Sequence, residues 1–197
     1  MDDMMQKQIL AASQKLFQQF GYPKVNMDDV AKAVGKGRSS LYYYYKSKDE
    51  IFQAVMDIEI GKTIADMTQA VEKVMGIEEK IKALFTAKLA SSRKRKELYN
   101  ALDMGMDSEE ASRYTKARQE VHRKMVDRQK ALLKEILEAG MASGELRLAK
   151  GELGTLVFLL SSSLNGLKRE MTMENDFGPA EPAVGLLVRL IFKGLKG

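Results

Sequence analysis

Apolar residues recur every three or four positions along most of the chain, which is the spacing of one face of an α-helix. This pattern predicts helices over residues 4–20, 27–34, 38–45, 48–74, 77–92, 94–105, 108–142, 150–172 and 179–195. No stretch alternates apolar and polar residues as a half-buried strand does. We therefore predict an all-α fold of about nine helices.

Residues that start and stop helices separate the first segments. Pro23 prevents the first helix from continuing, and Asn26 is a favourable N-cap for the second. Gly35 and Gly37 flank a sharp turn before the third helix, and Ser47 is placed to cap the fourth. The first three helices are thus predicted to be short and closely connected.

Residues 26–48 combine two short helices, a glycine turn and many hydroxyl and basic groups, as in a helix-turn-helix built to enter the DNA major groove. In the second of these helices Leu41 and Tyr45 share one face, so we expect both to be packed. The other faces carry Arg38, Ser39, Ser40, Tyr42, Tyr43 and Tyr44. A helix this short cannot bury every side, which leaves several of these groups to bind bases or phosphates.

The charge distribution also singles out the N-terminal part of the chain as the part that contacts a partner. The net charge is +5, and residues 1–48 hold eight Lys and Arg against four Asp and Glu, a balance of +4. A basic N-terminal quarter on a nearly neutral remainder suggests a polyanionic partner. On charge alone, a solvated basic face is an equal alternative.

The segment FQQFGYPKVNMDDVAKAVGKGRSSLYYYYKSKDEIFQAV resembles the N-terminal domain of TetR-type (tetracycline-repressor-like) regulators over about the first 55 residues. The family pattern is matched in register at Phe17, Gly21, Tyr22, Asp29, Val30, Ala31, Gly35, Leu41, Tyr42, Tyr44, Lys46, Ser47, Lys48 and Ile51. The turn departs from it, because Gly35-Lys36-Gly37 stands where Gly-Val-Ser is usual. Lys36 then either contacts a phosphate or lies in water, and glycine is an acceptable N-cap for the helix that follows.

The resemblance implies a homodimeric one-component transcriptional regulator, more often a repressor than an activator. It would bind a palindromic double-stranded DNA operator and be released by a small-molecule inducer. Residues 1–48 would form the DNA-binding domain, and residues 49–197 would bind the ligand and dimerise. By position, Tyr42 and Lys48 would hold phosphates, and Arg38, Ser39, Ser40 and Tyr43 would read bases. The full predicted DNA-binding set is Asn26, Asp28, Lys36, Arg38, Ser39, Ser40, Tyr42, Tyr43, Tyr44, Lys46 and Lys48.

The last two predicted helices are unusually apolar, and residues 150–172 are apolar on more than one face. Such a helix needs cover on several sides, and the small residues Ser161, Ser162, Ser163 and Gly166 would let another helix come close. Two helices from each of two chains would make a four-helix interface; the alternative is a bundle within one chain. The predicted interface residues are Leu156, Leu160, Leu164, Leu167, Val184, Val188 and Ile191.

A ligand pocket is expected between the helices of residues 48–142, because the resemblance places an inducer cavity there. The chain has 13 Met residues, whose flexible side chains suit an adaptable apolar pocket but also fill ordinary cores. The candidate pocket residues are Met67, Phe85, Tyr99, Met104, Tyr114, Arg118, His122 and Met125.

The composition speaks against other functions. With no Cys and one His, a transition-metal centre is poorly supported, and no residue is marked as a nucleophile, so we predict no enzyme and no cofactor. The chain has no run of 18 apolar residues and begins with the polar MDDMMQKQ, so we expect a cytoplasmic protein without a membrane partner.

Two rival functions make different demands on the sequence. One is an all-helical enzyme or a carrier of small molecules or lipids without specific DNA binding, which would need neither the basic quarter nor exposed Arg38, Tyr42 and Lys48. The other is a DNA-binding dimer without a ligand, and the sequence leaves it open.

Overall fold

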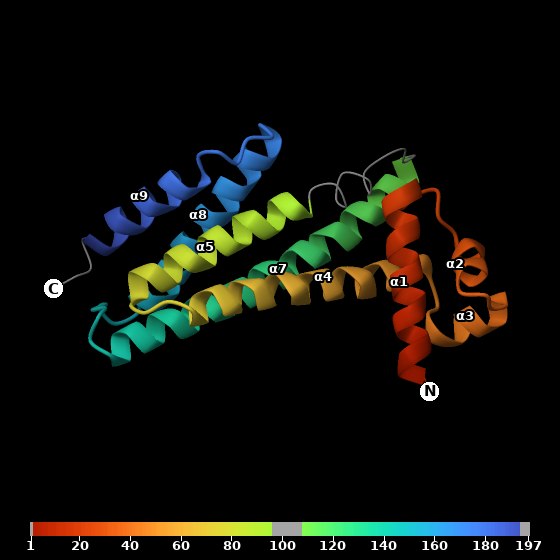
Figure 1. The fold of residues 1–197 in the computed structure, drawn as a ribbon, viewed down its shortest axis with the longest axis horizontal. Helices are drawn as coiled ribbons and strands as arrows, with labels where there is room; N and C mark the ends of the chain where they lie inside the picture. The colour runs from red at the N-terminus through yellow and green to blue at the C-terminus, as the bar shows by residue number, and fades with distance from the viewer. Residues whose placement is uncertain (1, 96–107, 194–197) are drawn as a thin grey trace. The chain divides into compact units, whose positions relative to one another are not determined.

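The computed structural model describes the backbone of residues 2–95 and 108–193, and the side chains of residues 3–95 and 115–193. Within these ranges the chain forms helices and turns, without a strand. The helices are α1 (Asp2–Phe20), α2 (Met27–Ala33), α3 (Arg38–Tyr44), α4 (Lys48–Glu72), α5 (Ile77–Lys94), α7 (Ser108–Ala142), α8 (Glu152–Met173) and α9 (Ala180–Lys193) (Figure 1). The all-α prediction is confirmed, and these helices end within two residues of the predicted segments. The predicted helix at 94–105 lies almost wholly outside the described residues.

The chain divides into two compact units. The first unit comprises Met1–Gly61 and Arg95–Arg123, and the second comprises Lys62–Lys94 and Lys124–Gly197. Helices α4 and α7 each contribute residues to both units. The functional boundary at residue 48 stays a prediction.

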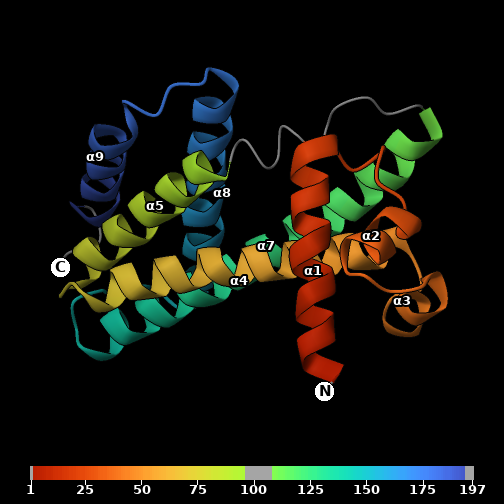
Figure 2. The ribbon, with the colours of Figure 1, turned by 45° about the vertical axis from the view of Figure 1, so that its right-hand side comes forward.

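In the first unit α2 packs against both α1 and α3 (Figure 2). Phe17, Tyr22 and Phe52 are each no more than 3% exposed and form an aromatic cluster. The rings of Tyr22 and Phe52 lie 5.0 Å apart and those of Phe17 and Phe52 6.0 Å apart, both edge to face. Such pairs add about 0.5–1.5 kcal/mol each to the stability gained from area burial. The cluster therefore fixes α1 and the loop after it to the start of α4.

A buried ion pair adds polar contacts to the first unit. The carboxylate of Glu59 in α4 accepts from Arg95 Nε at 2.8 Å and from Gln14 Nε2 at 3.2 Å. Glu59 is only 5% exposed, and a buried carboxylate is tolerated only when its oxygens are bonded. Each of its two oxygens has a partner, so the network joins α1 and α4 to the residue that follows α5.

The second unit has a continuous apolar core, to which the end of α4, the later part of α7, α5, α8 and α9 contribute. Helix α5 packs against both α8 and α9 (Figure 1). Phe85, Leu133 and Leu160 are fully buried there. A Cβ atom at Gly140 would overlap the side chain of Ile77, so the glycine allows the end of α7 to approach the start of α5.

Candidate nucleic-acid interface

Helix α2 begins with a reciprocal cap. The Asn26 side chain accepts a hydrogen bond from Asp29 N at 3.0 Å, and the Asp29 carboxylate accepts from Asn26 N at 2.9 Å. Two backbone donors at the helix end are thereby satisfied, and the acidic side chains of Asp28 and Asp29 complement the helix dipole. The predicted N-cap is confirmed. Whether Asn26 also approaches DNA stays a prediction.

The turn between α2 and α3 depends on Gly35, which has a φ of +66°, in the left-handed region that favours glycine. Gly37 follows as the N-cap of α3 in extended conformation, and it offers no side chain to cap the helix. Leu41 is 1% exposed and Tyr45 is 8% exposed, so the predicted packing of both residues is confirmed. Burial, and then the charge of Glu50, raise the pKa of the Tyr45 phenol, which keeps it neutral. These two residues anchor α3 and fix which sides of it face outward.

The outward sides of α3 carry the predicted polar groups. Tyr43 is 75% exposed and Tyr42 is 39% exposed, and Ser39 and Ser40 are also exposed. Tyr44 is half-buried, and its ring packs edge to face on Tyr43 with 5.1 Å between centroids. Lys36 and Lys46 lie exposed on either side of the helix. The structure therefore places donors and acceptors around a short, anchored helix, the geometry that base and phosphate contacts require.

Arg38 is held by two neighbours. Its guanidinium lies 3.4 Å from the Asp28 carboxylate, at both Nε and Nη1. Its Nη2 atom donates to the Tyr42 hydroxyl at 3.4 Å, and its Cζ atom lies 5.5 Å from the Tyr42 ring centroid. The hydrogen bond to Tyr42 and then the charge of Asp28 raise the pKa of Arg38, so the guanidinium stays charged. Asp28 therefore positions Arg38; a carboxylate is repelled by a phosphate, which argues against a direct backbone contact.

Arg38→Ala is expected to relax the base preference at one operator position, with roughly a tenfold to hundredfold loss of discrimination there. Asp28→Asn keeps the side-chain size but removes one negative charge, so it should raise affinity for every DNA sequence. The dissociation constants for the operator and its single-base variants, at two salt concentrations, measure both effects. If Arg38→Ala discriminates bases as the parent does, the assigned reading face is wrong.

Lys48 has a structural role that the sequence did not indicate. Its Nζ atom donates to the carbonyl oxygens of Tyr22 and Pro23 at 3.0 and 3.3 Å and lies 4.3 Å from the Tyr22 ring centroid. The Tyr22 hydroxyl donates to Asp49, the next residue of α4. Lys48 thus ties the start of α4 to the loop after α1, and any phosphate contact would add to that function.

Replacing the two lysines should separate phosphate binding from stability. Lys46→Ala removes an exposed charge, so it should weaken binding to all sequences alike and lower the salt slope by about one unit, with unchanged unfolding. Lys48→Ala should also lower the free energy of unfolding by about 1–2 kcal/mol, because it removes hydrogen bonds from a charged donor. Salt-dependent binding and urea denaturation distinguish the two. Equal stability of both variants would contradict the structural role of Lys48.

The predicted pocket residues fall in different places. Met67 and Phe85 are fully buried in the core of the second unit, and Met125 packs against the same core. Arg118 and His122 lie in the first unit and are exposed. The remaining three predictions, at Tyr99, Met104 and the Tyr114 side chain, lie outside the described residues. The structure thus brings Met67, Phe85 and Met125 together, and the pocket itself stays a prediction.

The predicted dimer residues are mostly inside their own chain. Five of them are between 0% and 7% exposed, namely Leu156, Leu160, Leu164, Val184 and Val188. The other two, Leu167 and Ile191, are half-buried. Side chains packed in the core of one chain leave little surface for a second copy, and the dimer interface itself stays a prediction. The large apolar side chains of α8 and α9 that are exposed are Phe158, Leu159, Met173, Leu186 and Leu190.

The described parts of the chain offer neither a metal site nor a membrane span. No group of three or more His, Cys, Asp or Glu side chains is placed to hold a metal ion there. Among the described helices, none is long and apolar enough to span a membrane.

Residues 9–55 match the model of the bacterial regulatory proteins of the tetR family. Over 193 residues the chain is 29% identical to the uncharacterized HTH-type transcriptional regulator YhgD of Bacillus subtilis, covering 96% of this chain and 95% of that protein.

Solved structures share the fold. A TetR transcription regulator from Haloarcula marismortui aligns over 99% of this chain and 100% of its own, with a TM-score of 0.71 and 16% identity. The regulator FadR of Bacillus subtilis, solved in complex with stearoyl-CoA, aligns over 96% and 98% with a TM-score of 0.67 and 17% identity.

Proposed function

We propose that this chain, which belongs to the tetR family of bacterial transcriptional regulators, is a homodimeric cytoplasmic repressor that binds a palindromic operator and is released by a small apolar ligand. The matching family and the relative are both described as regulators, which supports regulation of transcription and not catalysis. The dimer, the cytoplasmic location, the repression, the operator symmetry and the ligand are the proposed parts.

The exposed surface of α3 carries the proposal. Leu41 and Tyr45 anchor this helix, while Ser39, Ser40 and Tyr43 face outward and Arg38 is held beside them. A carrier or an enzyme that used the N-terminal helices only as structure would not need these polar side chains on an exposed surface. These side chains are explained if α3 reads base edges in the major groove while neighbouring lysines contact phosphates.

The exposed faces of α8 and α9 support the dimer. On α9, Pro182, Leu186 and Leu190 are exposed and four residues apart, so they lie on one side of the helix. On α8, Leu159 and Gly166 are exposed, and an added Cβ at Gly166 would meet no atom within 4 Å. Exposed large apolar residues on both helices, together with a small residue on α8, suit close packing against the same two helices of a second copy.

The ligand part of the proposal rests on the apolar interior of the second unit. Met67, Phe85 and Met125 contribute to it, and Met side chains repack readily around an apolar guest. Stearoyl-CoA, the ligand of the Bacillus subtilis neighbour, is the first compound to test. Release from DNA requires that the ligand prefer the DNA-free conformation, and a tenfold loss of affinity needs about 1.4 kcal/mol of coupling.

Selection of bound fragments from random and genomic DNA tests the proposed function. The full chain should enrich one inverted repeat, because each subunit of a symmetric dimer reads one half-site. The Arg38→Ala variant is the matched control and should lose preference at one position in each half. Enrichment of no sequence, or of a single unrepeated motif, would overturn the symmetric reading mechanism.

A further inference from the structure

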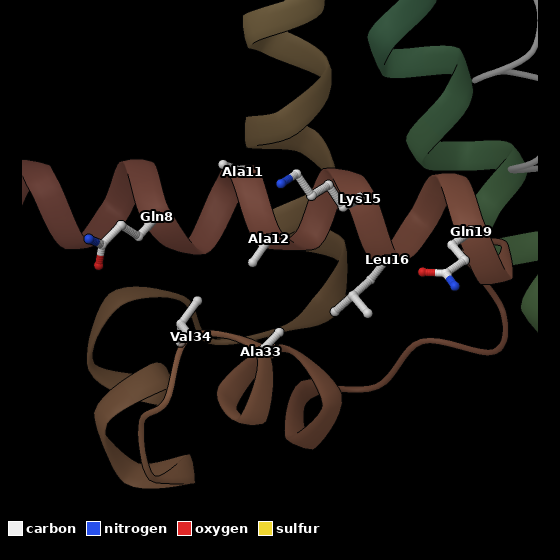
Figure 3. A pocket seen from close by; sticks show the side chains of 8 residues that line it. All are labelled: Gln8, Ala11, Ala12, Lys15, Leu16, Gln19, Ala33 and Val34. Carbon is white, nitrogen blue, oxygen red and sulfur yellow. The ribbon is translucent and has the colours of Figure 1, made fainter.

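Two hollows lie beside each other between α1 and α2 in the first unit, with volumes of about 510 Å³ and about 540 Å³. Leu16 and Ala33 line both, so we treat them as one surface, the α1–α2 groove. Figure 3 shows the first hollow, where Ala12 and Leu16 of α1 are directed towards Val34 and Ala33.

The floor of the α1–α2 groove is apolar. Ala12, Leu16 and Phe20 follow one another at intervals of four on α1, and Val25 and Ala33 line the opposite side. Phe20, at the end of this row, is 48% exposed and extends the apolar surface of the groove. From Gln8 to Phe20 the groove follows α1 for about 18 Å, the length of roughly three helical turns.

The rim of the α1–α2 groove is basic. Lys15, Lys24 and Lys32 line it and are exposed, and within the described part of the chain none of them forms an ion pair. Asp29 is the acidic residue of the lining, and its carboxylate already accepts from Asn26 N at 2.9 Å. The groove therefore offers an apolar floor between positive charges.

We infer that the α1–α2 groove docks an acidic amphipathic helix of a partner protein. Such a helix lays an apolar face into a groove of this length, and its Glu or Asp side chains meet the three lysines at the rim. A DNA backbone would satisfy the lysines but would leave Leu16 and Phe20 in water, so the floor favours the protein. The described lining includes no residue of α3, so the groove is distinct from the reading surface.

Peptide binding to the full-length protein tests this inference. The probe is a fluorescent 16-residue peptide, stapled into a helix, with Leu along one face and Glu on both flanks; the comparison peptide carries Lys in place of Glu. Fluorescence anisotropy should show the acidic peptide binding at least tenfold more tightly than the basic one. Phe20→Ser should weaken the acidic peptide about tenfold and leave DNA affinity unchanged. Lys15→Glu with Lys32→Glu should reverse the preference between the peptides.

The control variant is Met4→Ser, which removes another exposed apolar side chain of α1, 69% exposed, from outside the groove lining. It should bind the acidic peptide like the parent, and circular dichroism should show all variants folded. Equal binding of the two peptides by the parent would overturn the inference. Unchanged peptide affinity in Phe20→Ser would also overturn it. So would displacement of the peptide by an equimolar random-sequence duplex, because either result would indicate a phosphate-binding patch.

Discussion

The double variant Leu159→Arg and Leu190→Arg should be a folded monomer at micromolar concentration, and its operator affinity should fall to the non-specific level. The two side chains are 52% and 63% exposed in the single chain, so charge there costs the monomer little. In a dimer through α8 and α9 they would be covered, and four unpaired arginines would enter the apolar centre of the interface. Sedimentation velocity and DNA-binding titrations measure the two effects.

Met75→Arg is the matched control for this experiment. Met75 is 86% exposed and lies outside α8 and α9, so the same chemical change should leave both the dimer and the operator complex intact. Thermal unfolding should give similar midpoints for the control and the double variant when both are compared as monomers under dissociating conditions. A double variant that sediments as a dimer would show that the subunits meet through another surface.

The sequence pattern alone does not distinguish Leu159 from Leu160. The pattern of residues 150–172 is apolar on more than one face, which correctly indicates that more than one side of α8 needs cover. It does not say which side packs within the chain. Leu160 is fully buried and Leu159, its neighbour, is 52% exposed, because the two side chains lie on different sides of α8 and Leu160 is on the side that joins the core. An arginine at Leu160 is therefore expected to destabilise the second unit, which makes Leu159 the better position for testing the dimer.

Helix ends and the helix-turn-helix were predictable because their determinants are local. The cap at Asn26 involves Asp29, three residues away, and Ser47 Oγ accepts from Glu50 N at the start of α4 in the same way. The packing of Leu41 and Tyr45 follows from their spacing of four on a short helix. Signals of this kind are complete within one turn, so no tertiary information is needed to read them.

Contacts between distant segments were not predictable in the same way. Lys48 matched a phosphate-binding position, but its ammonium group reaches carbonyl oxygens 25 and 26 residues earlier. Arg38 was assigned to bases, and its pairing with Asp28 depends on the turn that brings α2 and α3 together. The buried pair of Glu59 and Arg95 joins residues 36 apart in the chain, and no sequence pattern predicts it. In each case the fold, rather than the residue type, decides what a charged side chain contacts.

An insertion of five base pairs at the centre of the operator should reduce binding to the non-specific level, a loss of about a thousandfold or more. In a two-fold symmetric dimer the two α3 helices enter successive major grooves on one side of the duplex, with centres roughly 34–36 Å apart. Half a turn of added DNA moves one half-site to the opposite side and lengthens the spacing. One subunit then loses its base contacts, and the other retains only a single half-site.

Replacement of the five central base pairs without a change in length separates geometry from sequence in this experiment. It leaves both half-sites in place, so most of the affinity should remain, apart from differences in the deformability of the central steps. The Leu159→Arg and Leu190→Arg monomer should bind the original and the inserted operator equally weakly, because it reads one half-site in either. If the parent protein keeps tight binding to the five-base-pair insertion, the two subunits read DNA independently, and the rigid symmetric dimer has to be abandoned.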